Sequence, residues 1–414
     1  MTAPKLRFKE FDGDWIKADI QSLVDEKIID KPMDGNHGEI HPTSADYVED
    51  GIPFVMATDV VDGKVHLGKS KKIQKSQADS LRKGFSLAGD ILLTHKATIG
   101  NVAKVPELKT PYIMLTPQVT YYRVLNKDKL TADFIKSSFE APIFQSELLA
   151  LCTGATRLYI GISEQRKLPF SYPSKEEQTK IASFLSAVDE KISQLTQKHS
   201  LLSQYKQGMM QKLFSQQIRF KADDGSEFGE WEEKNLVDIS NIITGTTPET
   251  ANKSFYNGAY LFVSPVDIQD NRYISQTKTT LTESGFRKCR AIPKNSILFV
   301  CIGSTIGKVA QNKKICTTNQ QINAVIPNDG YCVDYVYFQL LFQAESIKLK
   351  AGTQAVPIIN KTEFGKTTLR MPCLEEQTKI ANFLSAIEQK IEVVVQQIEQ
   401  AKQWKKGLLQ QMFV

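Results

Sequence analysis

One stretch of this sequence occurs twice at a constant offset. Residues 176–192 have the sequence EEQTKIASFLSAVDEKI and residues 375–391 have EEQTKIANFLSAIEQKI, an offset of 199 (375 − 176). The same offset relates YKQGMMQKLF, which begins at Tyr205, to WKKGLLQQMF, which begins at Trp404. An ungapped copy of this length indicates an internal repeat, so the chain is interpreted as two related halves.

Apolar residues in each copy recur in alternating steps of four and three. This spacing averages 3.5 residues and is typical of the seam of a coiled coil. His199, Lys206 and Lys405 interrupt the two seams with polar side chains. We predict two long helices, over 174–215 and 373–414. Their pairing residues would be Ile181, Leu185, Val188, Ile192 and Leu195 in the first helix, and Ile380, Leu384, Ile387, Ile391 and Val394 in the second.

Two further features concern the ends and interiors of these helices. Ser174 and Glu177 have the spacing of a capping box that would begin the first helix, whereas the second copy has Glu376 but a cysteine in place of the serine. Gly208 and Gly407 occupy matching interior positions, where glycine costs about 1 kcal/mol relative to alanine. Each glycine indicates either the close approach of another group or a tolerated residue.

The direction of pairing can be argued from chain length. Two matched seams in one chain are most simply satisfied by each other. Each helix would be about 60 Å long, whereas the segment 215–231 would span at most about 55 Å when fully extended. A parallel pair would leave that segment taut, because the chain would have to return along the first helix. We therefore predict an antiparallel pair with pseudo-two-fold symmetry.

The regions that precede the helices, 1–173 and 216–372, are each long enough to bury a core. Turn-flanked apolar runs such as Ile91–Thr94 and Ile297–Cys301 predict strands, and 131–151 and 333–349 predict helices. The fold class is thus α+β, with two similar globular domains separated by an antiparallel coiled coil. The globular regions differ more in sequence than the helices do. This difference suits the binding of two ligands, or of two parts of one ligand.

Composition limits the environment and the classes of partner. No apolar run has the length of a membrane span, and the start of the sequence lacks the apolar core of a secretory signal. The six cysteines form no CxxC pair, which argues against a zinc module and for a reducing compartment. We therefore expect a cytoplasmic protein. The net charge of +6 is mild and permits a polyanionic partner without requiring one.

Three short motifs are candidates for a metal, phosphate or catalytic site. His37 and His41 have the spacing of a metal pair on a helix, but the neighbouring glycines and proline favour a loop. Residues 303–309 resemble a phosphate loop that is one residue short between its glycines and has Val309 where Ser or Thr would bind magnesium. Residues 62–64 match only a fragment of a nuclease motif. The Asn-Pro-Pro-aromatic tetrad of amino-methyltransferases is missing, so we predict no catalytic residues and no metal site.

Clusters of basic residues are the strongest indication of a ligand. Lys and Arg side chains neutralise phosphates, and Gln or Arg can contact base edges. The alternative is an ordinary solvated surface. The candidate DNA-binding residues are Lys69, Lys71, Lys72, Lys75, Lys96 and Arg157 in the first globular region and Arg272, Lys278, Arg287, Lys288, Arg290 and Gln320 in the second; Arg82, Lys83 and His95 lie in the same basic stretch of the first.

At the two EEQTKIA-x-FLSA stretches the chain resembles the specificity subunit of type I restriction–modification systems. The order of variable region, helix, variable region and helix is typical of that family, and so are the segments 228–236 and 244–248. The resemblance implies that each globular region is a target-recognition domain for one half of a split DNA sequence. The helices would then set the unread spacer. No recognition residue can be carried over by motif.

The resemblance also implies partners. The subunit would have no catalytic activity and no cofactor of its own. Two methyltransferase subunits would methylate adenine with S-adenosylmethionine, and motor–nuclease subunits would use ATP and magnesium. Two alternatives remain open: a scaffold that binds no nucleic acid, with little affinity for duplex DNA, and a self-contained methyltransferase or nuclease that is active alone.

Overall fold

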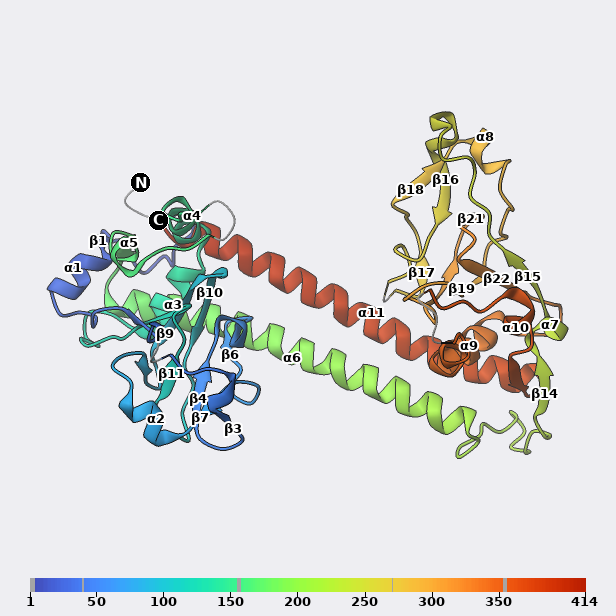
Figure 1. Ribbon diagram of the computed structural model, residues 1–414, viewed down its shortest axis with the longest axis horizontal. Helices are drawn as coiled ribbons and strands as arrows, with labels where there is room; N and C mark the ends of the chain where they lie inside the picture. Colours follow the sequence, from blue (N-terminus) through green and yellow to red (C-terminus); the bar gives the residue numbers. More distant parts are fainter. Residues whose placement is uncertain (1–3, 39–40, 155–157, 270, 353–355) are drawn as a thin grey trace. The chain divides into compact units, whose positions relative to one another are not determined.

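The computed structural model describes residues 4–38, 41–154, 158–269, 271–352 and 356–414 (Figure 1). The chain divides into two compact units. Unit 1 contains Met1–Thr196 together with Gln396–Val414, and unit 2 contains Gln197–Val395. Both boundaries fall inside the long helices α6 (Lys175–Phe214) and α11 (Leu374–Gln411). Each unit therefore contains one globular region and part of both helices.

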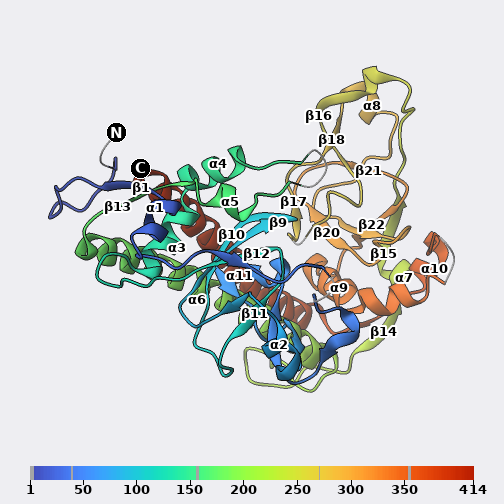
Figure 2. The ribbon, with the colours of Figure 1, turned by 60° about the vertical axis from the view of Figure 1, so that its left-hand side comes forward.

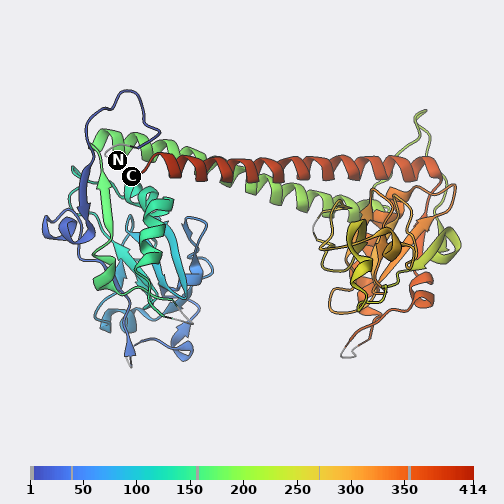
Figure 3. The same cartoon turned by 90° about the horizontal axis from the view of Figure 1, so that it is seen from above.

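The two long helices pair antiparallel, as predicted. In unit 1, Ile181 and Leu185 near the start of α6 share a core with Leu408 near the end of α11. Figure 3 shows the first turns of α6 and the last turns of α11 side by side in this unit. In unit 2 the relation is reversed, because Leu213 at the end of α6 shares a core with Ile380 at the start of α11.

Nearly all of the expected pairing residues are buried. Eight of them are 7% exposed or less: Ile181, Leu185, Val188, Leu195, Ile380, Leu384, Ile387 and Val394. Ile192 and Ile391 are partly buried against the cores of units 1 and 2, respectively. A Cβ added at Gly208 or Gly407 would meet no described atom within 4 Å. No described residue of this chain therefore makes a close approach at either glycine.

Unit 1 contains two main sheets. The first has the strand order β10-β9-β12-β2, with helix α3 against β9 and β10, and the second has the order β3-β7-β4-β11-β8 (Figure 1). The bounds are β1 Ile16–Asp19, α1 Ile20–Asp25, β2 Met33–Asp34, η2 Ser44–Asp46, β3 Tyr47–Val48, β4 Ile52–Val55, η3 Ala57–Asp59, β5 Val60–Val61, β6 Lys64–Val65, β7 Lys71–Ile73, α2 Lys75–Ser80, β8 Phe85–Ser86, β9 Ile91–Lys96, β10 Thr98–Lys104, β11 Ile113–Leu115, β12 Val119–Tyr122, α3 Ala132–Glu140, α4 Pro142–Ala150, α5 Ile162–Gln165 and β13 Pro169–Tyr172.

Unit 2 repeats this plan with a sheet of order β15-β22-β19-β20-β17 and a second of order β18-β16-β21. Helices α7 and α10 lie together at β15 (Figure 2). The bounds are β14 Glu232–Asn235, α7 Leu236–Ile239, β15 Ser240–Thr244, η4 Lys253–Phe255, β16 Tyr256–Val263, β17 Tyr273–Ile274, β18 Thr279–Leu281, α8 Glu283–Phe286, β19 Ile297–Val300, β20 Val309–Asn312, β21 Thr317–Thr318, β22 Ile322–Pro327, α9 Val333–Leu349, α10 Lys361–Gly365 and β23 Thr368–Met371.

The single helix predicted over 131–151 is wrong. The structure has two helices there, α3 and α4, separated at Ala141, whose backbone is extended (φ −67°, ψ 138°). Pro142 follows Ala141, and a proline disfavours the helical conformation of the preceding residue and cannot donate a backbone hydrogen bond. The helix predicted over 333–349 has the bounds of α9.

A glutamate at the start of each long helix joins it to the preceding chain. The Glu177 carboxylate accepts two hydrogen bonds of 2.7 Å from Arg7, and the Glu376 carboxylate accepts bonds of 3.1 and 2.7 Å from Arg219. The expected capping box is therefore only half formed. Ser174 Oγ accepts the Glu177 N–H at 3.4 Å, but the Glu177 side chain binds Arg7 instead of returning to the cap.

The glutamine that follows each glutamate makes the same contacts in both units. Gln178 donates to the Pro173 carbonyl at 2.9 Å and accepts the Thr131 N–H at 3.0 Å. Gln377 donates to the Pro372 carbonyl at 2.8 Å and accepts a backbone N–H at 2.9 Å from the residue before α9. The repeated Glu-Gln pair therefore fixes how the chain passes from each globular region into the long helix that follows.

All six cysteines are free thiols. Among the described residues, no helix combines the length and the apolar character that crossing a membrane requires.

Candidate nucleic-acid interface

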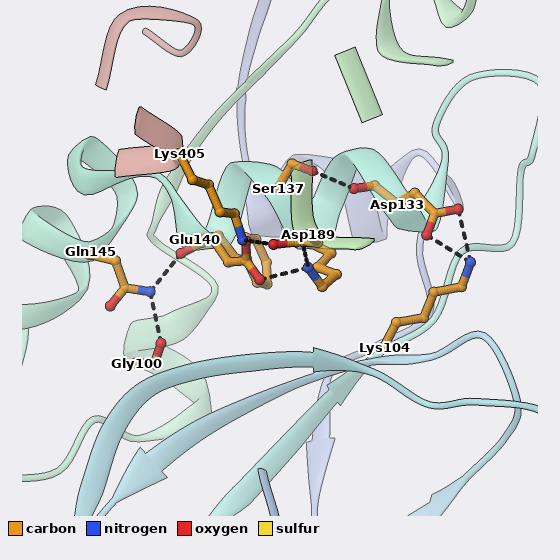
Figure 4. Close-up of polar contacts among 10 residues, drawn as sticks. Gly100, Lys104, Asp133, Ser137, Glu140, Gln145, Asp189 and Lys405 are labelled. Atoms are coloured by element: carbon orange, nitrogen blue, oxygen red, sulfur yellow. Dashed lines mark hydrogen bonds and ion pairs between the residues drawn. The ribbon is translucent and has the colours of Figure 1, made fainter. Parts of the chain in front are cut away.

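A network of four charged side chains joins three helices within unit 1. Lys405 of α11 lies 2.6 Å from Glu140 of α3 and 2.7 Å from Asp189 of α6. Lys136 of α3 lies 2.7 Å from Glu140 and 3.1 Å from Asp189. Figure 4 shows Glu140, Asp189 and Lys405 pointing toward one another. Two cations thus alternate with two anions. Lys405, which interrupts the apolar seam of α11, forms an ionic link from α11 to α6 and α3.

Unit 2 contains the equivalent link. Lys206 of α6 lies 2.9 Å from Glu388 of α11. The offset of 199 relates Lys206 to Lys405 and Asp189 to Glu388, so the same pair of helix positions is used twice. The globular region again adds a cation, because Arg272 lies 3.1 Å from Glu388.

Arg272 is therefore not a surface residue, although the sequence placed it among the DNA-binding candidates. Its side chain is only 7% exposed and also pairs with Asp334 at 2.5 Å. The guanidinium lies 4.4 Å from the ring centroid of Tyr337. We remove Arg272 from the candidate interface because its charge is used inside unit 2.

The other basic candidates lie mostly on the surface. Lys72 is half-buried and donates to the Glu49 carbonyl at 2.9 Å. Lys75 pairs with Asp79 at 2.6 Å, and Arg287 pairs with Glu283. Arg157 lies outside the described residues. The remaining candidates are exposed: Lys69, Lys71, Lys96, Lys278, Lys288, Arg290 and Gln320.

A row of polar side chains crosses three neighbouring strands at the same place in both units. In unit 1, Thr120 of β12 lies opposite Asp34 of β2, and its hydroxyl is 2.8 Å from Nδ1 of His95 on β9. In unit 2, Asn323 of β22 lies opposite Thr244 of β15 and accepts its hydroxyl at 2.7 Å. Asn323 also donates to the Cys301 sulfur, just after β19, at 3.2 Å. The frame is shared, but the chemical groups differ.

Asp34 binds two further side chains at the edge of this row. It accepts hydrogen bonds from Lys83 and, at 2.7 Å, from His37. Burial opposes ionisation of Asp34, but the bonds from Lys83 and His37 outweigh burial and hold the pKa of this carboxyl below its ordinary value. Sequence reasoning missed Asp34 because Lys83, which binds it, and Thr120, which lies opposite it, are distant in the chain.

Lowering the pH from 7 to 5 is expected to reduce the unfolding free energy through His95 by about 2 kcal/mol. Burial lowers the pKa of His95 from 6.5 to about 4. The native imidazole therefore stays neutral over this range, whereas the unfolded chain binds a proton, so stability is lost as the pH falls from 6.5 toward 4. Denaturant titrations at both pH values measure this loss. His95→Gln should remove it, and an unchanged pH dependence in the variant would contradict the prediction.

The three short motifs at residues 37–41, 62–64 and 303–309 form local contacts and turns. His37 binds Asp34, whereas the His41 ring packs at 5.4 Å from the Phe54 ring. Residues 62–63 form the turn of the β5–β6 hairpin, and residues 303–307 connect β19 and β20 with both glycines at φ +96°. Among the described residues, no group of three His, Cys, Asp or Glu side chains is placed to hold a metal ion.

Comparison with known proteins identifies the family. The family model described as the type I restriction modification DNA specificity domain matches residues 34–203 and, a second time, residues 229–403. The chain belongs to this family. It contains two DNA specificity domains, and each match combines most of one globular region with most of the helix that follows.

Individual relatives agree with this assignment. The chain is 32% identical over 186 residues to the type I restriction enzyme MjaIX specificity subunit of Methanocaldococcus jannaschii. This alignment covers 43% of each of the two proteins. It is 34% identical over 150 residues to the HindI specificity subunit of Haemophilus influenzae, covering 35% of this chain and 32% of that one. The chain therefore aligns with less than half the length of these two relatives.

A solved structure shows the same fold over the full chain. The type I restriction–modification S subunit from M. genitalium superimposes with a TM-score of 0.62 at 17% identity, covering 100% of this chain and 99% of that one. The predicted fold class, two similar α+β domains with a long antiparallel helix pair, is confirmed.

Proposed function

We propose that each globular region recognises one half of a bipartite DNA target and that the paired helices set the length of the spacer between the halves. The observation that carries the proposal is the pair of equivalent polar rows. His95 and Thr120 in one unit correspond to Cys301 and Asn323 in the other, and all four side chains are buried. The rows therefore show one frame that accommodates different chemical groups. Two domains built on such a frame can expose different side chains to two different half-sites, because base edges are distinguished by their pattern of donors and acceptors.

The chain would direct catalysis without performing it. In this proposal two methyltransferase subunits bind the chain and methylate adenine within the target, using S-adenosylmethionine. Motor–nuclease subunits that use ATP and magnesium join the complex, and the assembly acts in the cytoplasm. The exposed basic residues of both units would bind the phosphates of the duplex.

The decisive experiment is methylome sequencing of a methylation-free host that carries this chain with its methyltransferase partner. The expected result is a new adenine mark in a motif of two fixed parts with a constant gap. Absence of a mark, with the chain folded and bound to its partner, would contradict the proposal. It would favour a scaffold that binds no nucleic acid.

Replacing residues 1–173 with the corresponding region of another family member should change one half of the methylated motif and leave the other half and the gap unchanged. The physical reason is that the two units have separate cores. The same sequencing assay gives the result. A change in both halves would contradict independent recognition.

A further inference from the structure

A glycine turn follows the edge strand β2 in unit 1 and the edge strand β15 in unit 2. A Cβ on Gly35 would lie 1.8 Å from the carbonyl oxygen of Leu115, the last residue of β11, from which the chain leads into β12. A Cβ on Gly245 would lie 2.2 Å from the carbonyl oxygen of Asn319, just before β22. Because no side chain fits at either position, both turns lie directly against the segment that leads into the neighbouring strand.

Each turn holds an arginine in the same way. The backbone N–H of Arg82 donates to Asn36 Oδ1 at 3.1 Å, and the backbone N–H of Arg290 donates to Thr246 Oγ1 at 3.0 Å. Asn36 and Thr246 each follow the turn glycine directly. Both arginines are exposed. The two units therefore present an arginine from equivalent positions on a fixed backbone.

The other side chains held on these turns differ between the units. In unit 1, Asp34 binds Lys83 and His37, whose side chains are 32% and 56% exposed. In unit 2, Thr247 donates to the amide oxygen of the exposed Gln320 at 2.5 Å. Hydrogen bonds to the scaffold limit the rotamers of these groups, and such preorganised groups suit specific recognition.

This pattern separates two tasks in DNA binding. Contacts to phosphate carry no sequence information, so two domains that recognise different half-sites can share them. Contacts to base edges must differ between such domains. Building on the proposed function, we propose that Arg82 and Arg290 are equivalent phosphate contacts, and that His37 with Lys83 in unit 1 and Gln320 in unit 2 contact the bases of their half-sites.

The chemistry of these groups fits the two tasks. A guanidinium binds a phosphate through two parallel N–H groups. Arg290 uses one Nη to donate to the Thr244 carbonyl at 2.8 Å, which orients the rest of the group. A glutamine amide can bind adenine through a donor and an acceptor, and a lysine ammonium can donate to the O6 and N7 atoms of guanine. Because Nε2 of His37 is bonded to Asp34, this ring has only Nδ1 left to contact a base.

Binding of the full chain with its methyltransferase partner to a random-sequence duplex tests the phosphate contacts. Arg290→Ala and Arg82→Ala should each weaken binding and reduce the slope of log K against log salt by about 0.9. Arg290→Lys should retain most of the slope because it keeps the charge. Lys294→Ala serves as the matched control, since Lys294 is an exposed lysine four residues further along the chain. Equal slopes for Arg290→Ala and Lys294→Ala would overturn the phosphate assignment.

Methylome sequencing of variants tests the base contacts. Gln320→Ala should relax one or two positions in a single half of the motif, and His37→Ala should relax positions only in the other half. A discrimination loss of roughly 1–3 kcal/mol at one base pair corresponds to about a five- to 150-fold change in preference. An unchanged motif in both folded variants would overturn the base assignment.

The wild-type protein distinguishes failure of this inference from failure of the proposed function. If the wild-type complex produces no bipartite mark and no salt-dependent duplex binding, the proposed function fails. If the wild-type complex shows both but the variants behave like wild type, only the assignment of these residues fails. Thermal unfolding of each variant confirms that it is folded.

Discussion

Replacing Glu376 with alanine is expected to lower the unfolding free energy of unit 2 by about 3–5 kcal/mol. The Glu376 side chain is fully buried and pairs with Arg219 at 2.7 Å. It also accepts the Trp231 indole N–H at 3.0 Å. The substitution would leave a half-buried guanidinium and an indole N–H without their acceptor. Removing one member of a buried pair costs more than the net contribution of that pair, because the remaining charge is uncompensated.

Urea unfolding of the full chain measures this effect, and the neighbouring residue provides a matched control. Glu375 is exposed and lies 3.4 Å from Lys379, so Glu375→Ala should change stability by no more than about 0.5 kcal/mol. Glu376→Gln should have an intermediate effect, since the amide oxygen still accepts the Trp231 N–H but the charge is lost. Similar values for Glu376→Ala and Glu375→Ala would contradict the prediction.

The corresponding substitution in unit 1, Glu177→Ala, tests whether the two repeated glutamates contribute equally to the unfolding free energy. Glu177 binds Arg7 as Glu376 binds Arg219. In the described part of the chain, however, the buried Nε1 of Trp15 has no hydrogen-bond partner. Glu177→Ala should therefore cost less than Glu376→Ala by about the value of one hydrogen bond to a charged group, roughly 1.5–3 kcal/mol.

The long helices and their direction could be predicted from the sequence because the information is local and periodic. The repeat placed both helices, the spacing gave the seam, and the length of the intervening segment gave the antiparallel direction. The break at Ala141 was equally local, since Pro142 marks it. The prediction of one helix over 131–151 failed because apolar periodicity continues across a position where the backbone cannot be helical.

Partnerships between distant residues were harder to predict. Lys206 and Lys405 appeared as flaws in an apolar seam, yet each binds an acid of the other helix. The signal was present, because the offset that relates the two lysines also relates Asp189 to Glu388. By contrast, nothing local distinguishes Arg272 from the exposed basic residues. Its burial follows only from the tertiary position of β17 beside β20 and the α11 contact.

The candidate interface could likewise be predicted only in part from the sequence. Composition indicates that basic residues gather in two stretches, but a lysine count does not reveal which side chains are already paired. Lys75 and Arg287 each bind an acid one helical turn away. Arg82 lies in the first of these stretches, but its equivalence with Arg290 depends on two hydrogen bonds to the glycine turns that no local pattern reveals.

Replacing Lys405 with methionine is the second change expected to have a large effect, a loss of about 3–5 kcal/mol from unit 1. The Lys405 side chain is 17% exposed and contacts both Glu140 and Asp189. Its removal leaves two carboxylates that share only Lys136. Burial disfavours the charged form of the Asp189 carboxyl, and Lys136 and Lys405 together hold its pKa below its ordinary value. Removal of Lys405 therefore takes away part of the charge that compensates burial of this carboxylate.

The double variant Lys405→Met with Asp189→Leu separates two contributions to the unfolding free energy: the destabilisation by an unpaired charge, and the stabilisation by the intact network. It keeps the Lys136–Glu140 pair and a net charge of zero at this place, so it should be more stable than Lys405→Met alone. Lys402→Met is the matched control, because Lys402 is an exposed lysine on the same helix, 3.7 Å from Glu399. Urea unfolding of the four proteins gives the comparison. A double variant less stable than Lys405→Met would mean that Asp189 stabilises unit 1 through contacts other than this network.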